Sequence, residues 1–432
     1  MKSRTVACMI GIAAFVVLAA GIRLAAHAQP DPGIQPHYNV ADLGTLGGSF
    51  ATANSLNNLS VASGVSNLAG NTIARAALWF GGFKFDLGTL GGPNSNSAVL
   101  WPVKNVRGLI VGISETSKPS VLGEPFSCGA FIPRTGVTCQ GFMWKDRVMT
   151  ALPTLGGENS FATAANNAGQ IVGWAENNVH DPTCTGGQIL QFRAVIWGPN
   201  AGQIQELPPL PGDLDTAATA INDQGDVVGI SGACGIAVGG VSAAHAVIWK
   251  NGKVIKLADL GGTTNNTPMA INQFGEIAGF ALPASQNGTN NFHAVIWPKQ
   301  GGIIDLGVLP GDTISEATGL NDEGQIVGTS YTAGFASSRA FLYDDGRMTD
   351  LNKLTPPGAL LYLIATGDIN DEGQIAGGAC HLTDNACDPT QEEPAFLATP
   401  RNDGWNVDNN PPYVALPDFI RDAILRRHGI TH

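Results

Sequence analysis

Short apolar stretches recur along most of this chain, and Gly, Pro, Asn or Asp bounds each of them. The pattern is clearest at residues 294–297, 301–306, 316–321 and 325–330. A helix needs a longer periodic segment, whereas short apolar segments between turn-forming residues are typical of strands. We therefore expect a module of four β-strands.

The module is repeated, because at seven places along the chain an Asn is followed by a Gly seven residues later. Similarity at a spacing of about 49 residues indicates a repeat architecture. The usual phrase, Ile-Asn-Asp-x-Gly-x-Ile-Val-Gly, contains a tight-turn signal, so it predicts a hairpin between the first and second strands of each module. The pairs are Asn57 and Gly64, Asn105 and Gly112, Asn166 and Gly173, Asn222 and Gly229, Asn272 and Gly279, Asn321 and Gly328, and Asn370 and Gly377.

The first strand of each module is expected to lie innermost. The residues two and four positions before the Asn are mostly small, as at Ala162 and Ala164 or at Ala218 and Ala220. Small side chains on one face of a strand suit a place where repeated units converge. The third strand is an Ala-x-x-Trp element, and the fourth is an Ile-x-Asp-Leu element.

The two ends of the repeat region distinguish a closed array from an open one. The chain opens on a fourth strand at residues 38–43 and closes on a third strand at residues 394–397, so half a module is missing at each end. The sequence therefore predicts an all-β fold, a seven-bladed β-propeller of four-stranded blades over residues 38–400, closed by pairing of the N-terminal and C-terminal strands. A linear β-solenoid is the alternative, and it would need a cap at each end.

The first 28 residues have the pattern of a secretory signal peptide. Lys2 and Arg4 precede an apolar run at residues 6–22, and Ala-His-Ala stands before Gln29. We expect cleavage after residue 28, a linker at residues 29–37, and a secreted protein that is extracellular or periplasmic. An uncleaved membrane anchor is the alternative, because the apolar run approaches the length that spans a bilayer.

Six cysteines remain after this cleavage, since Cys8 is removed. An even number in an exported chain fits disulfide bonds, and six cysteines allow 15 pairings. Proximity in sequence favours two short loops and leaves the remaining two cysteines to pair with each other. A zinc site is disfavoured because no Cys-x-x-Cys pair is present. The expected pairs are Cys128 with Cys139, Cys380 with Cys387, and Cys184 with Cys234.

The mature chain would carry 20 basic and 35 acidic residues, a formal charge of −15. This charge opposes binding to nucleic acids and to anionic membrane surfaces. Beyond residue 400 the repeat stops, and residues 401–432 are expected to form an Asn- and Pro-rich linker followed by a short helix at residues 418–427. Ile420 and Ile424 would form the apolar edge of that helix. We expect a monomer without stable membrane insertion.

Several phrases resemble the HAF family of bacterial extracellular repeats. They include residues 245–249 (His-Ala-Val-Ile-Trp), 305–307 (Asp-Leu-Gly), 46–49 (Leu-Gly-Gly-Ser) and 221–225 (Ile-Asn-Asp-Gln-Gly). The resemblance covers about residues 38 to 400 and implies an exported bacterial protein, with no catalytic motif. The slot before the third strand departs from the family pattern, because it holds His only at positions 245 and 293.

That slot is basic in most modules, and two interpretations are open. Its side chains could form a ring of donors toward an acidic or sugar ligand. Alternatively, each could make a structural hydrogen bond within its own blade, with Asp223, Asp322 or Asp371 as partners, and recurrence with the repeat favours this structural role. The slot residues are Arg75, Arg193, His245, His293 and Arg339.

Candidate chemistry is sparse. No nucleophile elbow, phosphate loop or dinucleotide fingerprint is present, and we expect no cofactor. His180 and Asp181 beside Cys184, or His381 with Asp384, are too few to predict a metal site. The remaining enzymatic alternative is a pair of carboxylates in the connections between blades, as in glycoside hydrolysis. The candidates are Glu158, Asp213, Asp215 and Asp312.

The connections between second and third strands vary most in length. The longest covers residues 115–140, the next covers residues 175–191, and such connections hold all six remaining cysteines. Variable loops on a rigid scaffold are where recognition usually resides. The sequence therefore predicts a secreted protein with a non-enzymatic binding or scaffolding role toward a glycan, a protein or an envelope component. An extracellular hydrolase or lyase that uses the carboxylates above is the alternative.

Overall fold

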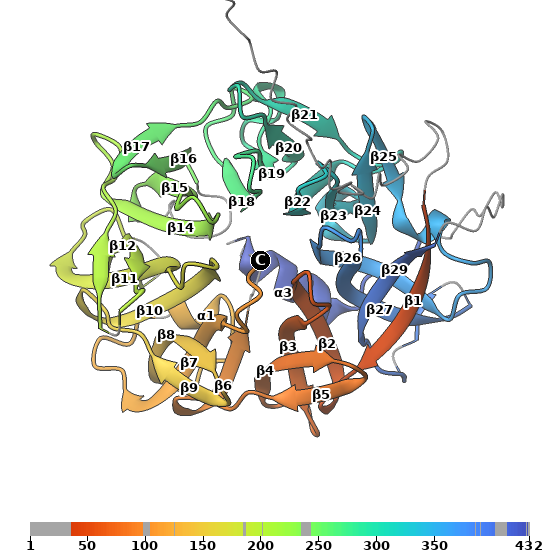
Figure 1. Cartoon of the computed structure of the whole chain (residues 1–432), viewed down its shortest axis with the longest axis horizontal. Helices are drawn as coiled ribbons and strands as arrows, with labels where there is room; N and C mark the ends of the chain where they lie inside the picture. The colour runs from red at the N-terminus through yellow and green to blue at the C-terminus, as the bar shows by residue number, and fades with distance from the viewer. Residues whose placement is uncertain are drawn as a thin grey trace, which may run out of the picture. The chain divides into compact units, whose positions relative to one another are not determined.

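Seven four-stranded antiparallel sheets form the blades of a β-propeller and stand in a ring (Figure 1). This computed structural model describes residues 36–97, 104–124, 126–184, 187–200, 202–234, 243–384, 386–388, 390–401, 413–428 and 430. The predicted signal peptide, and all but the last two residues of the linker predicted to follow it, lie outside these residues.

The first six blades are contiguous in sequence, and each runs from its inner to its outer strand. Blade 1 comprises β2 (Gly47–Leu56), β3 (Ala62–Leu68), β4 (Ala74–Phe80) and β5 (Phe83–Asp86). Blade 2 comprises β6 (Gly91–Ser97), β7 (Ile110–Pro119), β8 (Val137–Lys145) and β9 (Val148–Ala151). Blade 3 comprises β10 (Gly156–Ala165), β11 (Ile171–His180), β12 (Leu190–Trp197) and β13 (Ile204–Glu206).

Blades 4 to 6 repeat the same order. Blade 4 comprises β14 (Asp215–Ile221), β15 (Val227–Gly232), β16 (His245–Lys250) and β17 (Lys253–Lys256). Blade 5 comprises β18 (Thr267–Ile271), β19 (Ile277–Ala281), β20 (His293–Trp297) and β21 (Ile304–Gly307). Blade 6 comprises β22 (Ile314–Leu320), β23 (Ile326–Tyr331), β24 (Ser338–Asp344) and β25 (Arg347–Asp350).

Blade 7 is assembled from both ends of the repeat region. Its strands are β26 (Leu361–Ile369), β27 (Ile375–Thr383), β29 (Ala395–Arg401) and, outermost, β1 (His37–Gly44). Strand β1 pairs antiparallel with β29, with Tyr38 opposite Pro400. The predicted ring closure is thus confirmed, and it leaves no open edge between the first and last blades. Strand β28 (Ala386–Cys387) adds a short hairpin to β27.

The repeated Gly, seven residues after the Asn, lies on the second strand of each blade, where the inner strand approaches it closely. A Cβ at Gly229 would overlap the carbonyl oxygen of Ala217, next to a register irregularity of the inner strand between Ala218 and Ala220. None of the seven has a positive φ, in contrast to the glycine of the turn itself, such as Gly225 with a φ of 80°. The repeated Gly is therefore a steric requirement of the inner hairpin and not a turn residue.

The same overlap recurs in every other blade. In each, the obstructing atom is a backbone carbonyl oxygen of the inner strand, so no larger side chain fits without a shift of the hairpin. The pairs are Gly64 with Thr52, Gly112 with Asn96, Gly173 with Phe161, Gly279 with Thr267, Gly328 with Glu316, and Gly377 with Ala365.

The repeated Asn forms a belt of hydrogen bonds around the channel. Asn222 shows the pattern: its Nδ2 donates to the carbonyl oxygen of Asn272 in the next blade at 3.2 Å, and its Oδ1 accepts from the N–H of Asp226 in its own turn at 3.0 Å. Asn105 is the exception, since its Nδ2 donates within its own hairpin, to Leu109 O. The corresponding bonds join Asn57 to Asn105, Asn166 to Asn222, Asn272 to Asn321, Asn321 to Asn370, and Asn370 back to Asn57.

Apolar clusters fill the spaces between blades. Trp249 of blade 4 packs with Ala164 and Val172 of blade 3, and its Nε1 donates to the carbonyl oxygen of Pro208 at 2.7 Å. The small inner-strand residues predicted from the sequence leave room for such indole rings. The predicted inner position of the first strand is therefore confirmed.

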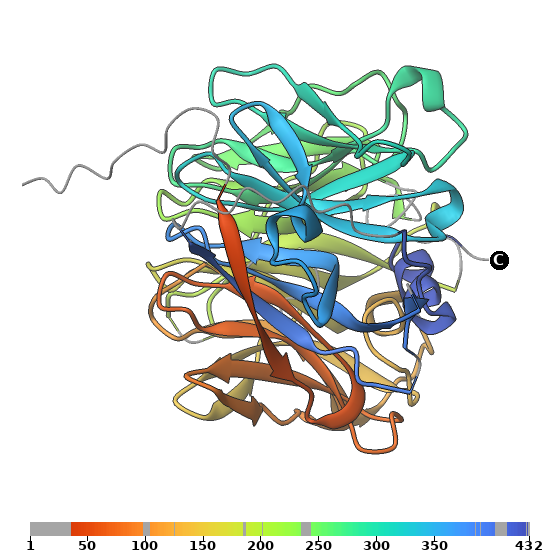
Figure 2. The same ribbon diagram turned by 90° about the vertical axis from the view of Figure 1, so that its right-hand side faces the viewer.

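The two faces of the ring differ. The short-turn face carries the Asn hairpins, whereas the long-loop face carries the connections between second and third strands and between blades. Short helices on this second face include α1 (Phe126–Gly129), η1 (Ala284–Gln286), η2 (Ala333–Phe335) and η3 (Leu351–Leu354). Helix α3 (Asp418–Arg427) has the predicted bounds and lies over the centre of the ring in Figure 1 and at the edge of one face in Figure 2. Across the residues that the structure describes, no helix is long and apolar enough to span a bilayer.

Candidate functional site on the long-loop face

Three disulfide bonds staple the long loops, with the predicted pairing. Cys128–Cys139 lies within blade 2, and Cys380–Cys387 lies within blade 7. Cys184–Cys234 joins the long loop of blade 3 to that of blade 4. All three contribute to one apolar cluster around the mouth of the channel. The irregular loops are therefore covalently fixed around that mouth.

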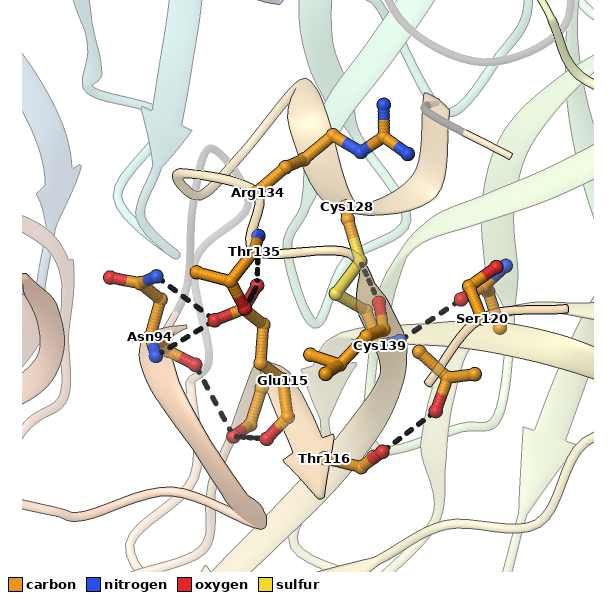
Figure 3. The surroundings of a disulfide bond; sticks show 12 residues. Asn94, Glu115, Thr116, Ser120, Cys128, Arg134, Thr135 and Cys139 are labelled. Carbon is orange, nitrogen blue, oxygen red and sulfur yellow. Dashed lines mark hydrogen bonds between the residues drawn. A yellow bond between two sulfur atoms is a disulfide. The ribbon is translucent and has the colours of Figure 1, made fainter. Parts of the chain in front are cut away.

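Buried Glu115 anchors the longest loop (Figure 3). Its Oε2 accepts from the backbone N–H and the side-chain amide of Asn94, at 3.1 and 2.9 Å. Its Oε1 accepts from the N–H and the hydroxyl of Thr135, both at 2.8 Å. A carboxylate that receives four donors is well compensated for its burial. Glu115 thus holds the segment before Cys139 against the inner strand of its blade.

Blade 3 repeats this arrangement with a second acid added. Glu176 accepts from the N–H of Asn159 at 2.8 Å and from the side-chain amide of Gln188 at 3.1 Å. The same amide donates to Glu124 of the blade 2 loop at 3.2 Å. Burial, and then the charge of Glu124, raise the pKa of Glu176 to about 7. Two acids bridged by one amide therefore connect the long loops of blades 2 and 3.

Asp215 occupies in blade 4 the place that Asn94 and Asn159 occupy in blades 2 and 3. Its Oδ1 accepts from the N–H of Phe192 in the preceding blade at 2.9 Å, as Asn159 accepts from Cys139. Burial and a hydrogen bond with the Asp181 carboxyl raise the pKa of Asp215 to about 8. A protonated Asp215 can donate to Asp181 where the asparagines donate to glutamates.

Asp181 stays ionised beside it. Burial raises its pKa, but hydrogen bonds from Asp215 and Thr183 outweigh burial and lower it overall. Thr183 also accepts from the N–H of Cys234 at 3.0 Å, next to the inter-blade disulfide. The carboxyl pair therefore lies under the stapled loops of blades 3 and 4.

The other predicted carboxylates are each held by separate partners. Glu158 accepts from the hydroxyl of Ser120 at 2.7 Å and from the N–H of Val121 at 2.9 Å. Asp213 accepts from Ser231 Oγ at 2.6 Å and lies 2.9 Å from Nδ1 of His245. Asp312 pairs with Arg339 at 2.7 Å. No hydrogen bond or ion pair among the described residues joins any two of Glu158, Asp213, Asp215 and Asp312.

Three residues of the basic slot pair with acids on the outer strands of their own blades, which favours its structural interpretation. Arg75 pairs with Asp86, and Arg193 with Glu206, both on outer strands. His293 likewise pairs with Asp305 at 2.9 Å, and this hydrogen bond offsets the effect of burial and lowers the pKa of Asp305. The Asp of the Ile-x-Asp-Leu element thereby gains a role.

The partners suggested for that slot were wrong. Asp223, Asp322 and Asp371 lie in the turns of the short-turn face, where each accepts from a backbone N–H of the preceding blade. A second belt of hydrogen bonds therefore runs beside the Asn belt. The slot and these turns occupy opposite ends of the strands, so side chains of their length cannot meet.

No cysteine among the described residues is available to the two candidate metal sites, His180 with Asp181 and His381 with Asp384. Cys184 and Cys380 are consumed by disulfides, and His381 lies 3.8 Å from Asp42. Within the described ranges no group of three or more His, Cys, Asp or Glu side chains is arranged to hold a metal ion.

Sequence reasoning missed Asp181 as the partner of Asp215, and it missed Glu124. An available signal was the alignment of modules, because Asp215 replaces an asparagine that recurs in two earlier blades. The role of Glu124 had no such signal, since it depends on the folded path of an irregular loop.

No family model matches this chain, and no curated protein matches it. Solved structures align with it at low identity. The acylaminoacyl peptidase of Pyrococcus horikoshii is 11% identical, with a TM-score of 0.42, over 81% of this chain and 52% of that one. Trypanosoma rangeli sialidase in complex with sialic acid is 11% identical, with a TM-score of 0.38, over 85% and 59%. The gluconolactonase XC5397 of Xanthomonas campestris is 9% identical, with a TM-score of 0.34, over 85% and 94%. This chain spans about half the length of the peptidase, and no activity carries over at these values.

Proposed function

We propose that this chain is an exported propeller of the HAF repeat type that binds an extracellular ligand, without chemical turnover, through its long-loop face. The observation that carries the proposal is the covalent and polar linkage of loops from neighbouring blades. The Cys184–Cys234 disulfide joins blades 3 and 4, while Glu124 and Gln188 join blades 2 and 3. A surface fixed in this way loses little conformational entropy on binding.

Exposed apolar side chains on this face offer contact points for a glycan, a protein or an envelope component. Val121 lies in the blade 2 loop with 87% of its surface exposed, and its backbone N–H donates to Glu158. Leu360, just before the inner strand of blade 7, is 80% exposed. Fixed loops that present apolar groups to solvent are typical of recognition surfaces.

The test is binding of the purified mature chain to glycan and peptide arrays. Val121→Asp and Leu360→Asp should each reduce the signal at least tenfold. Phe274→Asp on the short-turn face is the control, because Phe274 is also apolar and 57% exposed but lies on the opposite side. Equal loss for all three variants would contradict binding through this face. Turnover of an array ligand would contradict a non-enzymatic role.

The Asp181–Asp215 pair favours a second candidate function, that of an extracellular hydrolase. A protonated Asp215 hydrogen-bonded to an ionised Asp181 has the charge states of a carboxyl dyad that activates water, whereas a glycosidase keeps its two carboxyls about 5 Å or more apart. Both side chains are buried, so a substrate would need the stapled loops to open. The test is hydrolysis of a panel of chromogenic esters and peptides near pH 6. Turnover that Asp215→Asn abolishes would favour this candidate over the binding role.

A further inference from the structure

The C-terminal tail, residues 413–428 with Ile430, covers the mouth of the channel on the long-loop face (Figures 1 and 2). Its side chains Val414, Leu416, Ile420, Ile424 and Leu425 are buried in the same apolar cluster as the aromatic residues of the long loops. The predicted apolar edge of helix α3 is thus the surface that contacts the propeller.

One polar side chain of the tail enters this cluster. His428 is only 2% exposed, and three phenylalanines surround its ring. The ring centroid lies 5.6 Å from that of Phe335 in a stacked arrangement, 5.0 Å from Phe292 and 5.9 Å from Phe280. Nε2 of His428 lies 3.4 Å from Oε2 of Glu316. We call Phe280, Phe292, Phe335 and Glu316 the cup.

The acid of the cup is not required by the repeat. Glu316 faces Thr329 on β23, and the equivalent inner-strand positions of blades 3, 4 and 5 are Phe161, Ala217 and Thr267. Glu316 is nevertheless 1% exposed, and the hydroxyl of Tyr331 donates to its Oε1 at 2.5 Å. A buried carboxylate is costly unless it meets a cation or several donors.

A carboxylate surrounded by aromatic rings is a site that can bind a cation. The π-faces attract imidazolium, ammonium or guanidinium groups, and the carboxylate adds charge and orientation. His428 caps the C-terminal end of helix α3. The helix dipole is negative at this end, and it favours a cation there. The tail thus places a cation-forming side chain, flanked by aliphatic ones, where the cup can hold it.

Polar contacts join the described part of the tail to the propeller, and they include an isolated β-bridge between Ser337 and Ala415. The backbone N–H of Leu416 donates to Ala336 O at 3.0 Å. Two side chains of the tail also donate to carbonyl oxygens of the propeller, Tyr413 Oη to Pro310 O at 2.6 Å and Arg421 Nε to Gly334 O at 3.3 Å. A helix of ten residues is marginal in water without packing. Residues 402–412 connect the tail to β29, and eleven residues can span up to about 36 Å. The connecting segment is therefore long enough for the tail to leave the mouth.

We propose that the channel mouth is a binding site for a protein segment that presents a cationic side chain beside aliphatic ones, and that the tail occupies this site as an internal ligand. This inference rests on the proposed binding role of the long-loop face and gives that role a partner class. An external segment binds by displacing the tail, and the cup selects it through Glu316 and the three phenylalanines.

The test uses the full chain and a fluorescent synthetic peptide of residues 413–432. In fluorescence anisotropy, the Ile420→Asp/Ile424→Asp variant, whose own tail is released, should bind the peptide at least tenfold more tightly than the unaltered chain. A peptide with His428→Ala, or a Glu316→Gln substitution added to the variant, should each weaken binding at least tenfold. Circular dichroism checks that the variants are folded. Equal binding of both peptides, or none by the folded variant, would overturn the inference.

A second measurement covers the case in which that variant does not fold. A protease site placed within residues 402–412 is cleaved after folding, and exchange of the severed tail for labelled peptide is followed. Exchange that His428→Ala slows or weakens supports the inference, whereas no exchange in a day at excess peptide contradicts it. If the arrays yield a ligand whose binding needs Val121 while the peptide fails, only this inference falls and the proposed function stands.

Discussion

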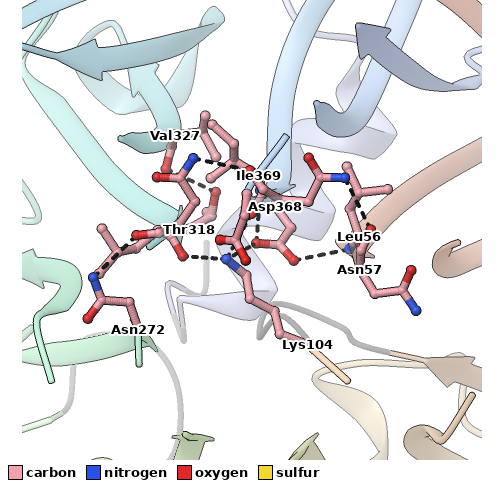
Figure 4. Close-up of polar contacts among 12 residues, drawn as sticks. Leu56, Asn57, Lys104, Asn272, Thr318, Val327, Asp368 and Ile369 are labelled. Carbon is pink, nitrogen blue, oxygen red and sulfur yellow. Dashed lines mark hydrogen bonds and ion pairs between the residues drawn. The ribbon is translucent and has the colours of Figure 1, made fainter. Parts of the chain in front are cut away.

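The ammonium nitrogen of Lys104 lies 3.3 Å from Oδ1 of Asp368 (Figure 4). Lys104 belongs to blade 2, where it precedes Asn105, whereas Asp368 lies on β26 of blade 7. The same nitrogen donates to the carbonyl oxygen of Ile369 at 2.8 Å and to that of Leu320 in blade 6. Asp368 is fully buried and also accepts from the N–H of Leu56 at 3.0 Å. One cation thus ties together blades that are not neighbours in the ring.

Lys104→Met should destabilise the fold by about 3 kcal/mol, because it leaves the buried carboxyl of Asp368 without its cation. Urea unfolding at pH 7 measures the free energy of unfolding. Lys104→Met with Asp368→Asn is the matched control and should recover most of the loss, since no unpaired charge remains. A single variant within about 0.5 kcal/mol of the original chain would show that the pair is not structural.

Stability should fall as the pH rises from about 5 to 8. Burial raises the pKa of Asp215 to about 8, of Glu176 and Glu393 to about 7, and of Asp368 to about 6. In the unfolded chain these carboxyls lose their protons near pH 4, so between pH 4 and 8 the folded state binds more protons than the unfolded state. This stabilisation is complete below about pH 4 and is lost as the pH passes each folded-state pKa. Calorimetry at pH 5 and pH 8 should show a Tm about 3 to 6 °C lower at pH 8.

Asp215→Asn should flatten that dependence and preserve the fold. An amide can accept from the N–H of Phe192 and donate to Asp181 without needing a proton, as Asn159 does in blade 3. The Tm at pH 8 should rise by about 1 to 3 °C relative to the original chain, with little change at pH 5. Glu372→Gln removes an exposed carboxyl and should leave the slope unchanged. A lower Tm for Asp215→Asn at pH 8 would contradict the shared-proton arrangement.

Asn222→Ala should cost about 2 to 3 kcal/mol. The change removes the bond to Asn272 O in the next blade and the acceptor for the N–H of Asp226, and it leaves both backbone groups without these partners. Asn178→Ala, at an exposed position of β11, is the control and should change the unfolding free energy by less than about 0.5 kcal/mol. Similar values for both variants would mean that the belt does not hold blades together.

The inter-blade disulfide should matter more than the local one. The loop closed by Cys184–Cys234 has a sequence separation of 50, against 7 for Cys380–Cys387. Chain entropy then gives about 4 kcal/mol for the first and about 2 kcal/mol for the second. Replacement of each pair by alanine, followed by urea unfolding, compares them. A larger loss for the Cys380/Cys387 pair would show that native contacts, not chain entropy, dominate.

Much of the scaffold could be predicted because the repeat supplies its own evidence. Seven copies of the Asn…Gly phrase reveal a period, and the split module at the two ends reveals the closure between β1 and β29. Proximity sufficed for the disulfides because two pairs are close in sequence. The partners of the basic slot were harder to predict, since the sequence does not show at which end of a strand a side chain finds its acid.

The sequence by itself determined the architecture: short strands, tight turns and small inner residues specify a seven-bladed ring, because these preferences are local and recur. Only the tertiary structure decided which residues that depart from the repeat form specific contacts with one another. Lys104 pairs with Asp368, Asp215 forms a hydrogen bond with Asp181, and His428 packs in the cup beside Glu316. Each of these pairs joins segments that are distant in sequence, and burial in the folded molecule sets their charge and their partners.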